Sequence, residues 1–271
     1  MAESARRRKL GLALSGGATR GLAHVGVLEV LEENGLRPDF ISGTSIGAFG
    51  AALYAFGVPI QEIRSTVMGL SVVKISKLKL TRFGLFSHED LGRVLRSKIG
   101  RAGIEEATIP LAIVAADIGT GEKVVLREGE TAAAVMASSA LPGIYQPVVI
   151  DGRVLVDGGI VENVPVSPLR PMGADVVAAV NLSAERRYRD PEDIIDVLFN
   201  SFDIAIDENT KEQIKRADIP IEPRLPYYKH VETSKYDEFF TAGRQAATEA
   251  IPKIREELNR PDGQRRERRQ S

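Results

Sequence analysis

Short apolar runs alternate with helical patterns along most of this 271-residue sequence, and the alternation restricts the folds open to it. Leu10–Leu14 is typical of a buried strand, and Leu22–Asn34 of a helix with one apolar face, ended by Gly35. Strands that alternate with helices favour a parallel sheet, because each helix carries the chain back across it. The sequence therefore predicts an α/β fold, a three-layer α/β/α sandwich with a largely parallel central sheet. Further strands are predicted at Phe40-Ile41, Leu111–Ala115 and Val176–Val180, and further helices at Ala48–Phe56, Ile194–Ala217 and Tyr236–Leu258.

The same patterns predict how the chain is organised. Pro147–Ile150 and Arg153–Val156 flank Asp151-Gly152, a two-residue hairpin signal. We expect a catalytic core at residues 9–182 and a helical C-terminal extension at 183–258, packed on the same domain. Both ends are charged and poor in apolar residues, so we expect a flexible basic tail at 1–8 and a disordered charged tail at 259–271.

Composition excludes several classes of function. Lys and Arg number 36 and Asp and Glu 37, so no overall basic field indicates a nucleic-acid partner. Cysteine is absent, which excludes thiolate metal sites and a cysteine nucleophile. Three histidines, His24, His88 and His230, are too few for a histidine-rich metal centre, and we expect no metal or other cofactor. No apolar stretch approaches a membrane-spanning length, so we expect a cytoplasmic protein, at most peripheral to a membrane.

A G-x-S-x-G pentapeptide, Gly43-Thr44-Ser45-Ile46-Gly47, lies between a predicted strand and an apolar helix. A sharp strand-to-helix turn needs small residues on both sides of the serine and presents its hydroxyl at the carboxyl edge of the sheet. The following helix directs its first N–H groups toward a developing oxyanion. The pentapeptide therefore indicates a nucleophilic Ser45, with a glycine-rich loop and an incidental serine as the alternative.

The loop that joins the first strand to the first helix is also rich in glycine, Ser15-Gly16-Gly17-Ala18-Thr19-Arg20-Gly21. Glycines permit close approach of the backbone to a ligand, and successive N–H groups at a helix start bind anionic oxygen. A dinucleotide loop is disfavoured, because the spacing is not G-x-G-x-x-G and no acidic residue ends the second strand. A P-loop is disfavoured because no Gly-Lys-Ser/Thr follows.

A third element is Val156-Asp157-Gly158-Gly159, an aspartate that ends an apolar strand. Asp151 is the better example of an ordinary turn aspartate. We expect Asp157 to lie at the same carboxyl edge as Ser45. A carboxylate can act on a serine if burial and the scarcity of cationic neighbours keep it basic.

In this order, the three elements resemble the patatin-like phospholipase family. The resemblance covers residues 10–182 and extends over five blocks, Ser15–Leu28, Gly43–Ala48, Asp117–Glu122, Ala137–Val148 and Asp157–Pro165. It implies a lipid acyl hydrolase, a serine carboxylic-ester hydrolase that acts on lipid or acyl-ester substrates.

The resemblance also implies roles for individual residues. Ser45 would attack the ester carbonyl, Asp157 would take its proton, and water would hydrolyse the acyl-enzyme. Ala18 stands where the family commonly has a third glycine, a departure that a negative φ would tolerate. The oxyanion hole would be formed by Gly16, Gly17 and Ala18, and the supporting residues would be Arg20, Gly43, Gly47, Gly158 and Gly159.

Other functions remain open. Ser45, Asp157 and His230 occur in the chain order of an α/β-hydrolase triad. The dyad is favoured because Ser45 follows only the second strand and His230 lies in a polar segment typical of a surface loop. A non-catalytic adaptor on the same fold is a further alternative, and the presence of both Ser45 and Asp157 disfavours it. A nucleotide-binding regulator is disfavoured by the loop spacing described above.

Residues 64–86 combine basic and apolar side chains without one acidic residue. Lys stems cover apolar surface while their charged ends attract anions. One hypothesis is that this segment makes peripheral contact with an anionic membrane. The other is an ordinary surface element whose apolar residues pack inward. The basic residues are Arg64, Lys74, Lys77, Lys79 and Arg82.

Overall fold

The computed structural model describes residues 6–72, 78–81, 84–86, 89–184, 188, 190–192, 194–225 and 235–261. Its strands are β1 (Leu10–Leu14), β2 (Phe40–Thr44), β3 (Leu78–Thr81), β4 (Gly84–Phe86), β5 (Leu111–Asp117), β6 (Lys123–Leu126), β7 (Gly143–Tyr145), β8 (Val148–Ile150), β9 (Arg153–Asp157), β10 (Val176–Val180) and β11 (Ile219–Ile221).

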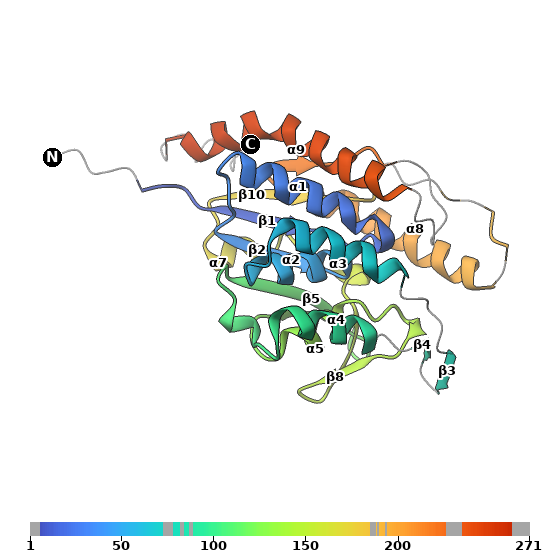
Figure 1. Cartoon of the computed structure of the whole chain (residues 1–271). Coiled ribbons are helices and arrows are strands. Elements are labelled where there is room, and N and C mark those ends of the chain that lie inside the picture. The colour runs from blue at the N-terminus through green and yellow to red at the C-terminus, as the bar shows by residue number, and fades with distance from the viewer. Residues whose placement is uncertain are drawn as a thin grey trace.

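Within the described ranges, eight of these strands form one central sheet (Figure 1). The order is β11-β10-β1-β2-β5-β9-β8, and β6 pairs with β5 off this path. The first five strands are parallel, whereas β9, β8 and β6 pair antiparallel to their neighbours. The predicted α/β class with a largely parallel sheet is confirmed. A small second sheet contains β3, β4 and β7.

Helices cover both faces of the central sheet. In Figure 1, α9 runs alongside α1 on one side of the sheet, and α4 and α5 lie toward the other end of it. The helices are α1 (Leu22–Glu33), α2 (Ile46–Ala55), α3 (Ile60–Val72), α4 (Glu89–Ile99), α5 (Thr131–Ser138), α6 (Gly159–Glu162), α7 (Leu169–Met172), α8 (Ile194–Ile214) and α9 (Tyr236–Asn259), with short 3₁₀ turns at Ala18–Gly21 and Ile104–Glu106.

The alternation of side chains along the strands divides the core into two parts. Leu12 and Ile41 belong to the larger cluster, which includes the apolar faces of α1, α2 and α9. Ala13 and Phe40 belong to a smaller cluster on the opposite face, with Leu169 of α7. Successive strand residues point to opposite faces, so fully apolar strands require cover on both sides. The three-layer prediction therefore agrees with the packing.

Strands β2 and β9 end against each other on one edge of β5. Thr44, the last residue of β2, is opposite Val114, and Asp157, the last residue of β9, is opposite Ala115. Backbone hydrogen bonds place both strands on the same edge of β5. Pro110 bonds to Ile41 of β2 and Ile118 bonds to Val154 of β9, whereas Asp117 bonds to Glu122 on the β6 side. Backbone groups of successive strand residues alternate between the two edges, and these three residues follow that rule. The chain after β2 and the end of β9 thus converge on one point.

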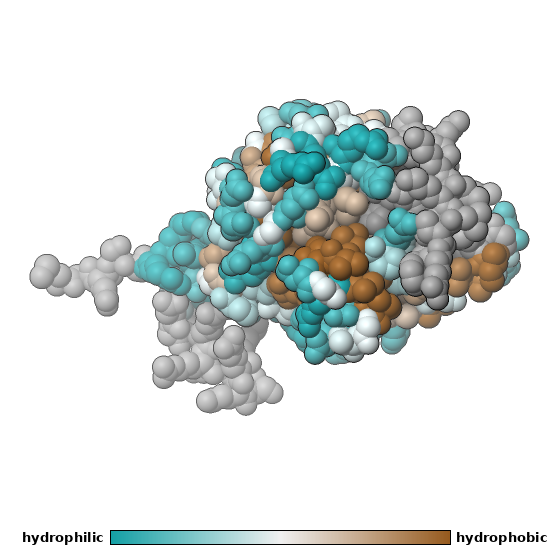
Figure 2. All heavy atoms as spheres, turned by 90° about the horizontal axis from the view of Figure 1, so that it is seen from below, coloured by the Kyte–Doolittle hydropathy of each residue, from teal (hydrophilic) through white to brown (hydrophobic). Residues whose placement is uncertain are grey.

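The hairpin between β8 and β9 has the predicted two-residue turn. Asp151 has a φ of 50° and Gly152 a φ of 77°, the left-handed pair that a type I′ turn requires. Val149 and Val154 are paired across the hairpin and are 67% and 39% exposed. Ile118, whose N–H bonds to Val154, is also exposed. Figure 2, which views the molecule from below, shows apolar surface on this side.

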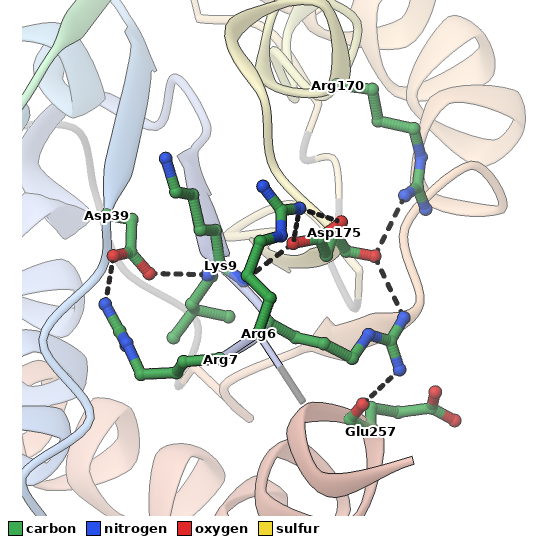
Figure 3. Close-up of polar contacts among 9 residues, drawn as sticks. Arg6, Arg7, Lys9, Asp39, Arg170, Asp175 and Glu257 are labelled. Atoms are coloured by element: carbon green, nitrogen blue, oxygen red, sulfur yellow. Dashed lines mark hydrogen bonds and ion pairs between the residues drawn. The ribbon is translucent and has the colours of Figure 1, made fainter. Parts of the chain in front are cut away.

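Residues 6–10 hold the end of the sheet at which the parallel strands begin, opposite their carboxyl ends (Figure 3). Asp175 accepts hydrogen bonds from the Lys9 N–H at 2.9 Å and from the Arg6 guanidinium at 2.9 Å. Asp39 accepts from the Leu10 N–H at 2.8 Å and pairs with Arg7. The predicted N-terminal tail is therefore in contact with the sheet from residue 6 onward. Residues 1–5 and 262–271 lie outside the described ranges, and flexibility there stays a prediction.

No helix in the described part of the chain combines the length and apolar character needed to cross a bilayer.

Candidate active site

Ser45 occupies a sharp turn between β2 and α2. Its φ of 55° and ψ of −124° are rare for a residue other than glycine, and such backbone strain is concentrated at functional sites. The flanking glycines permit the turn by close approach rather than by positive φ. A Cβ on Gly43 would lie 2.4 Å from the Ala48 Cα, and one on Gly47 would lie 2.2 Å from the Leu14 carbonyl oxygen. Side chains at either position would disrupt the turn.

Asp157 ends β9 beside Ser45, and the structure brings the two predicted residues together. The carboxylate accepts a hydrogen bond from the Gly159 N–H at 2.7 Å, and the Ser45 side chain also hydrogen-bonds to it. Gly158 lies tightly against β5, since a Cβ there would be 2.2 Å from the Val114 carbonyl oxygen. Asp157 itself is only 6% exposed.

Burial raises the pKa of Asp157 from 3.8 to about 6. The hydrogen bonds from Gly159 and Ser45 lower the pKa, and the negative charge of Asp203 on α8 raises it. Because loss of hydration disfavours the charged carboxylate, the first effect dominates. The group is therefore a stronger base than an exposed aspartate and is still largely ionised at neutral pH.

The glycine-rich loop after β1 lies against the same point. A Cβ on Gly16 would lie 3.5 Å from the Ser45 Cβ. The Gly16 N–H donates to the Asn163 carbonyl at 3.2 Å, so that amide is already engaged. In the described part of the chain, the N–H groups of Gly17 and Ala18 donate no hydrogen bond. The Thr19 N–H donates none there either, so Gly17, Ala18 and Thr19 are the free amides of the loop.

Ala18 has a φ of 49°, so the negative φ that would readily accommodate alanine is not found. A left-handed conformation costs a residue with a Cβ about 1–2 kcal/mol. The chain adopts the backbone shape that a third glycine would favour, without that glycine. The loop shape is thus maintained by its surroundings.

Arg20 and His24 supply part of that support. The Arg20 guanidinium is buried and donates to the Gly17 carbonyl at 3.2 Å and to the Leu182 carbonyl at 2.7 Å. His24 Nε2 lies 2.8 Å from the Ser15 carbonyl, and burial lowers the pKa of His24 to about 4, so the ring is neutral at pH 7. His24 is thus packed inside the protein. Both side chains hold backbone carbonyls of the loop.

Helix α8 contributes contacts that sequence patterns did not predict. Thr210 accepts from the Asn163 amide at 3.1 Å, and Gln213 accepts from the Val164 N–H at 3.0 Å. Both side chains are buried and lie three residues apart on the inner face of α8. They hold the segment that follows Asp157, whose Asn163 carbonyl binds Gly16. A polar pair at helical spacing is the only signal that the sequence carries for this role.

His230, the third member of the alternative triad, and His88 both lie outside the described residues. Among the residues that are described, no group of three or more His, Asp or Glu side chains could hold a metal ion.

Most of the basic segment at 64–86 also falls outside the ranges where side chains are described. Arg64, at its start, pairs with Asp237 at 2.7 Å and lies over the Phe240 ring. Val67 of the same helix is buried in the core. For this first part, the inward-packing interpretation agrees with the structure. Membrane contact by the remainder stays a prediction.

Comparison with known families shows to which family the chain belongs. The family model for patatin-like phospholipases matches residues 12–170, more than half of the chain. The chain belongs to the patatin-like phospholipase family. The matched range contains Ser45, Asp157 and the glycine-rich loop, and it ends before α8. The hydrogen bonds of Thr210 and Gln213 to Asn163 and Val164 therefore come from a helix outside the matched range.

Relatives within the family align over part of their length. An NTE family protein of Mycobacterium tuberculosis, described as uncharacterized, is 34% identical over 178 residues, which cover 65% of this chain and 49% of the relative. Lysophospholipase NTE1 of Pyricularia oryzae is 30% identical over 187 residues, covering 65% of this chain and 12% of that protein. The chain thus spans about half or less of the length of these relatives.

Solved structures support the fold. VipD from Legionella pneumophila aligns with a TM-score of 0.61 and 15% identity, covering 93% of this chain and 72% of that one. ExoU of Pseudomonas aeruginosa, in complex with SpcU, aligns with a TM-score of 0.50 and 17% identity, covering 94% of this chain and 54% of that one.

Proposed function

We propose that the protein is a lipid acyl hydrolase that uses Ser45 as nucleophile and Asp157 as general base. The observation that carries the proposal is the convergence of Ser45, in a strained turn, on a buried carboxylate whose pKa is raised to about 6. A base whose pKa lies near the working pH is effective in proton transfer. Family membership supports an ester substrate, and Lysophospholipase NTE1 is a relative whose name describes such an activity.

The proposed reaction has two steps. Ser45 Oγ bonds to the acyl carbon while its proton moves to Asp157, and the carbonyl oxygen becomes an oxyanion. The leaving alcohol takes the proton from Asp157, which leaves an ester on Ser45. Water then attacks the acyl carbon and gives a proton to Asp157, and the Ser45 oxygen departs with that proton. Free acid and intact enzyme result.

We assign the oxyanion hole to the N–H groups of Gly17 and Ala18, with Gly16 as the residue that positions the loop. Donors prearranged around a developing charge supply a large part of the rate enhancement in acyl transfer. Support comes from the free state of these two amides and from the engagement of the Gly16 N–H with Asn163. The first N–H groups of α2 add a favourable dipole near Ser45.

A lipid substrate is supported by apolar surface on the hairpin whose second strand ends at Asp157. Val149 and Val154 are exposed on the hairpin that leads into Asp157. An exposed apolar patch on a protein surface commonly marks a contact with a partner or a membrane. The adaptor alternative shares this surface but requires no reactive serine, so activity separates the two.

We expect the activity on a short soluble ester to rise with pH through an apparent pKa of about 6 and then to level off. Asp157 must be ionised to accept the proton, so activity is lost as the pH falls below that value. The measurement is kcat/KM between mildly acidic and mildly alkaline pH, at constant ionic strength. A rise centred near the ordinary aspartate pKa, or above neutral pH, would contradict the assignment of the base.

The function is tested by hydrolysis of p-nitrophenyl esters and lysophospholipids of graded acyl-chain length. We expect turnover that exceeds that of a Ser45→Ala variant on at least one ester series, with longer chains preferred over acetate. The enzyme should need no added metal. A folded protein that hydrolyses none of these esters above the variant would favour the adaptor alternative.

A further inference from the structure

The junction between β2 and β9 is occupied by a side chain from another element. At this point on the edge of β5, β2 turns away after Thr44 and β9 stops at Asp157. The Ile41 N–H donates to the Pro110 carbonyl, so a regular ladder would bring the Ser45 N–H to the Val114 carbonyl, but that N–H donates to Ser138 instead. Ser138, the last residue of α5, donates its hydroxyl to that carbonyl at 2.6 Å. The Ser138 side chain is fully buried.

The same hydroxyl accepts a hydrogen bond from the Ser45 N–H at 2.8 Å. Ser138 Oγ therefore bridges the backbone of β5 to the backbone of the nucleophile. The hydroxyl donates its proton to Val114 and accepts one from Ser45, and the two bonds together fix its orientation. The bond also withdraws the Ser45 amide from any role in binding the oxyanion.

The segment around Ser138 also binds the end of β9. The Asp157 N–H donates to the Ala140 carbonyl at 2.9 Å, and the Gly158 N–H points to the Ser138 carbonyl at 3.4 Å. These carbonyls lie at or just past the end of α5, where the last turn leaves carbonyl groups without helical partners. One short stretch, residues 138–140, thus contacts the backbone of Ser45 on one side and of Asp157 on the other.

We propose that Ser138 is a positioning residue, whose hydroxyl fixes the strained backbone of Ser45 at the distance from Asp157 that proton transfer needs. This inference rests on the proposed function and adds to it a residue that touches neither substrate nor the reacting atoms. The Ser45 conformation is unfavourable by itself and persists because its surroundings determine it. Errors of about 1 Å in the placement of reacting groups cost on the order of 100-fold in rate.

The test compares Ser138→Ala and Ser138→Cys with a matched control, Thr131→Val. The cysteine fills the space of the serine but is a weak donor and acceptor, so it separates hydrogen bonding from packing. Thr131 is equally buried at the other end of α5, and its hydroxyl donates to the Ala102 carbonyl at 2.9 Å. The control therefore removes a comparable hydrogen bond of the same helix away from the site.

We expect kcat on a short soluble ester to fall about 10- to 100-fold in both Ser138 variants, with KM within about twofold of the wild type. The pH at half-maximal activity should move slightly upward, because a displaced Ser45 donates a weaker hydrogen bond to Asp157 and that bond lowers the pKa of the carboxyl. Thr131→Val should keep its kcat within about twofold of the wild type. Its Tm should fall by about as much as the Tm of the Ser138 variants. A kcat within about threefold of wild type in both Ser138 variants, or an equal loss in the control, would overturn the proposal.

A second measurement is independent of activity. Amide hydrogen exchange of the Ser45 N–H should become at least about tenfold faster in both Ser138 variants and remain unchanged in Thr131→Val. Unchanged protection of that amide would overturn the positioning role even if the enzyme is active. If the wild type hydrolyses no ester, the proposed function fails, and the exchange result still decides whether Ser138 holds Ser45.

Discussion

Ser45→Ala should lower kcat for ester hydrolysis by at least about 1,000-fold and abolish labelling by a fluorophosphonate. The proposed reaction passes through an ester on the Ser45 oxygen, and alanine offers no atom to carry it. What remains is the contribution of the oxyanion hole and of substrate binding, which is small compared with the complete site. The Cβ is retained, so the strained turn and its contacts should persist.

The matched control is Ser97→Ala. Ser97 is exposed on α4, and within the described ranges its hydroxyl bonds only to the Val94 carbonyl of its own helix. This variant should keep both activity and labelling. Equal Tm values for the wild type and Ser45→Ala, within a few degrees, would show that the loss of activity is chemical. Retained hydrolysis in a folded Ser45→Ala protein would remove Ser45 from the mechanism.

Asp157→Asn should lower kcat by on the order of 1,000- to 10,000-fold. Asparagine preserves the shape of the side chain, and its carbonyl oxygen can still accept the hydrogen bond from Gly159 at this position. It cannot take the proton of Ser45, so the substitution isolates the base function. The measurement is kcat on a soluble ester across the pH range, and the rise of activity near pH 6 should vanish in this variant.

Two variants distinguish the dyad from its alternatives. Asp151→Asn changes an exposed turn aspartate at a φ of 50°, a conformation that asparagine tolerates, and it should keep full activity. His230→Ala removes the third residue of the alternative triad and should also keep most activity. If His230→Ala lost as much activity as Ser45→Ala while remaining folded, a triad would replace the dyad.

Much of the fold could be predicted because the buried strands are short and fully apolar. Val176–Val180 is observed with the predicted bounds, and the hairpin at Asp151-Gly152 has the turn that its residues indicate. The short strands β6 and β7 were not predicted. Their three or four residues carry too little periodicity to distinguish a strand from a loop, and their pairing depends on β5 and β4.

The site could be predicted as far as glycines and a serine define local backbone shape. Ser45 and Asp157 were expected at one edge of the sheet, and the structure places them together there. The support around them could not be predicted. Ser138, Thr210 and Gln213 act through contacts set by how α5 and α8 pack, and a single polar residue on a helix has no local signature of such a role.

Ala18 shows a different reason for the gap. A negative φ would have accommodated alanine in place of the family's glycine, but the observed φ is 49° and neighbours distant in the chain hold it there. Gly17 packs against Leu182, and Arg20 bonds to the Leu182 carbonyl. Tertiary contacts of this kind override a local preference worth about 1–2 kcal/mol.

The central claim is that Ser45 becomes acylated with Asp157 as its base, and the most direct test is the mass of the labelled enzyme. Wild-type protein treated with a fluorophosphonate and digested should show the adduct on the peptide that contains Ser45, at one label per chain. Asp157→Asn should acquire the same adduct much more slowly, and Ser45→Ala should acquire none. An adduct on a different residue would contradict the account. So would ester hydrolysis at an undiminished rate once Ser45 is fully labelled.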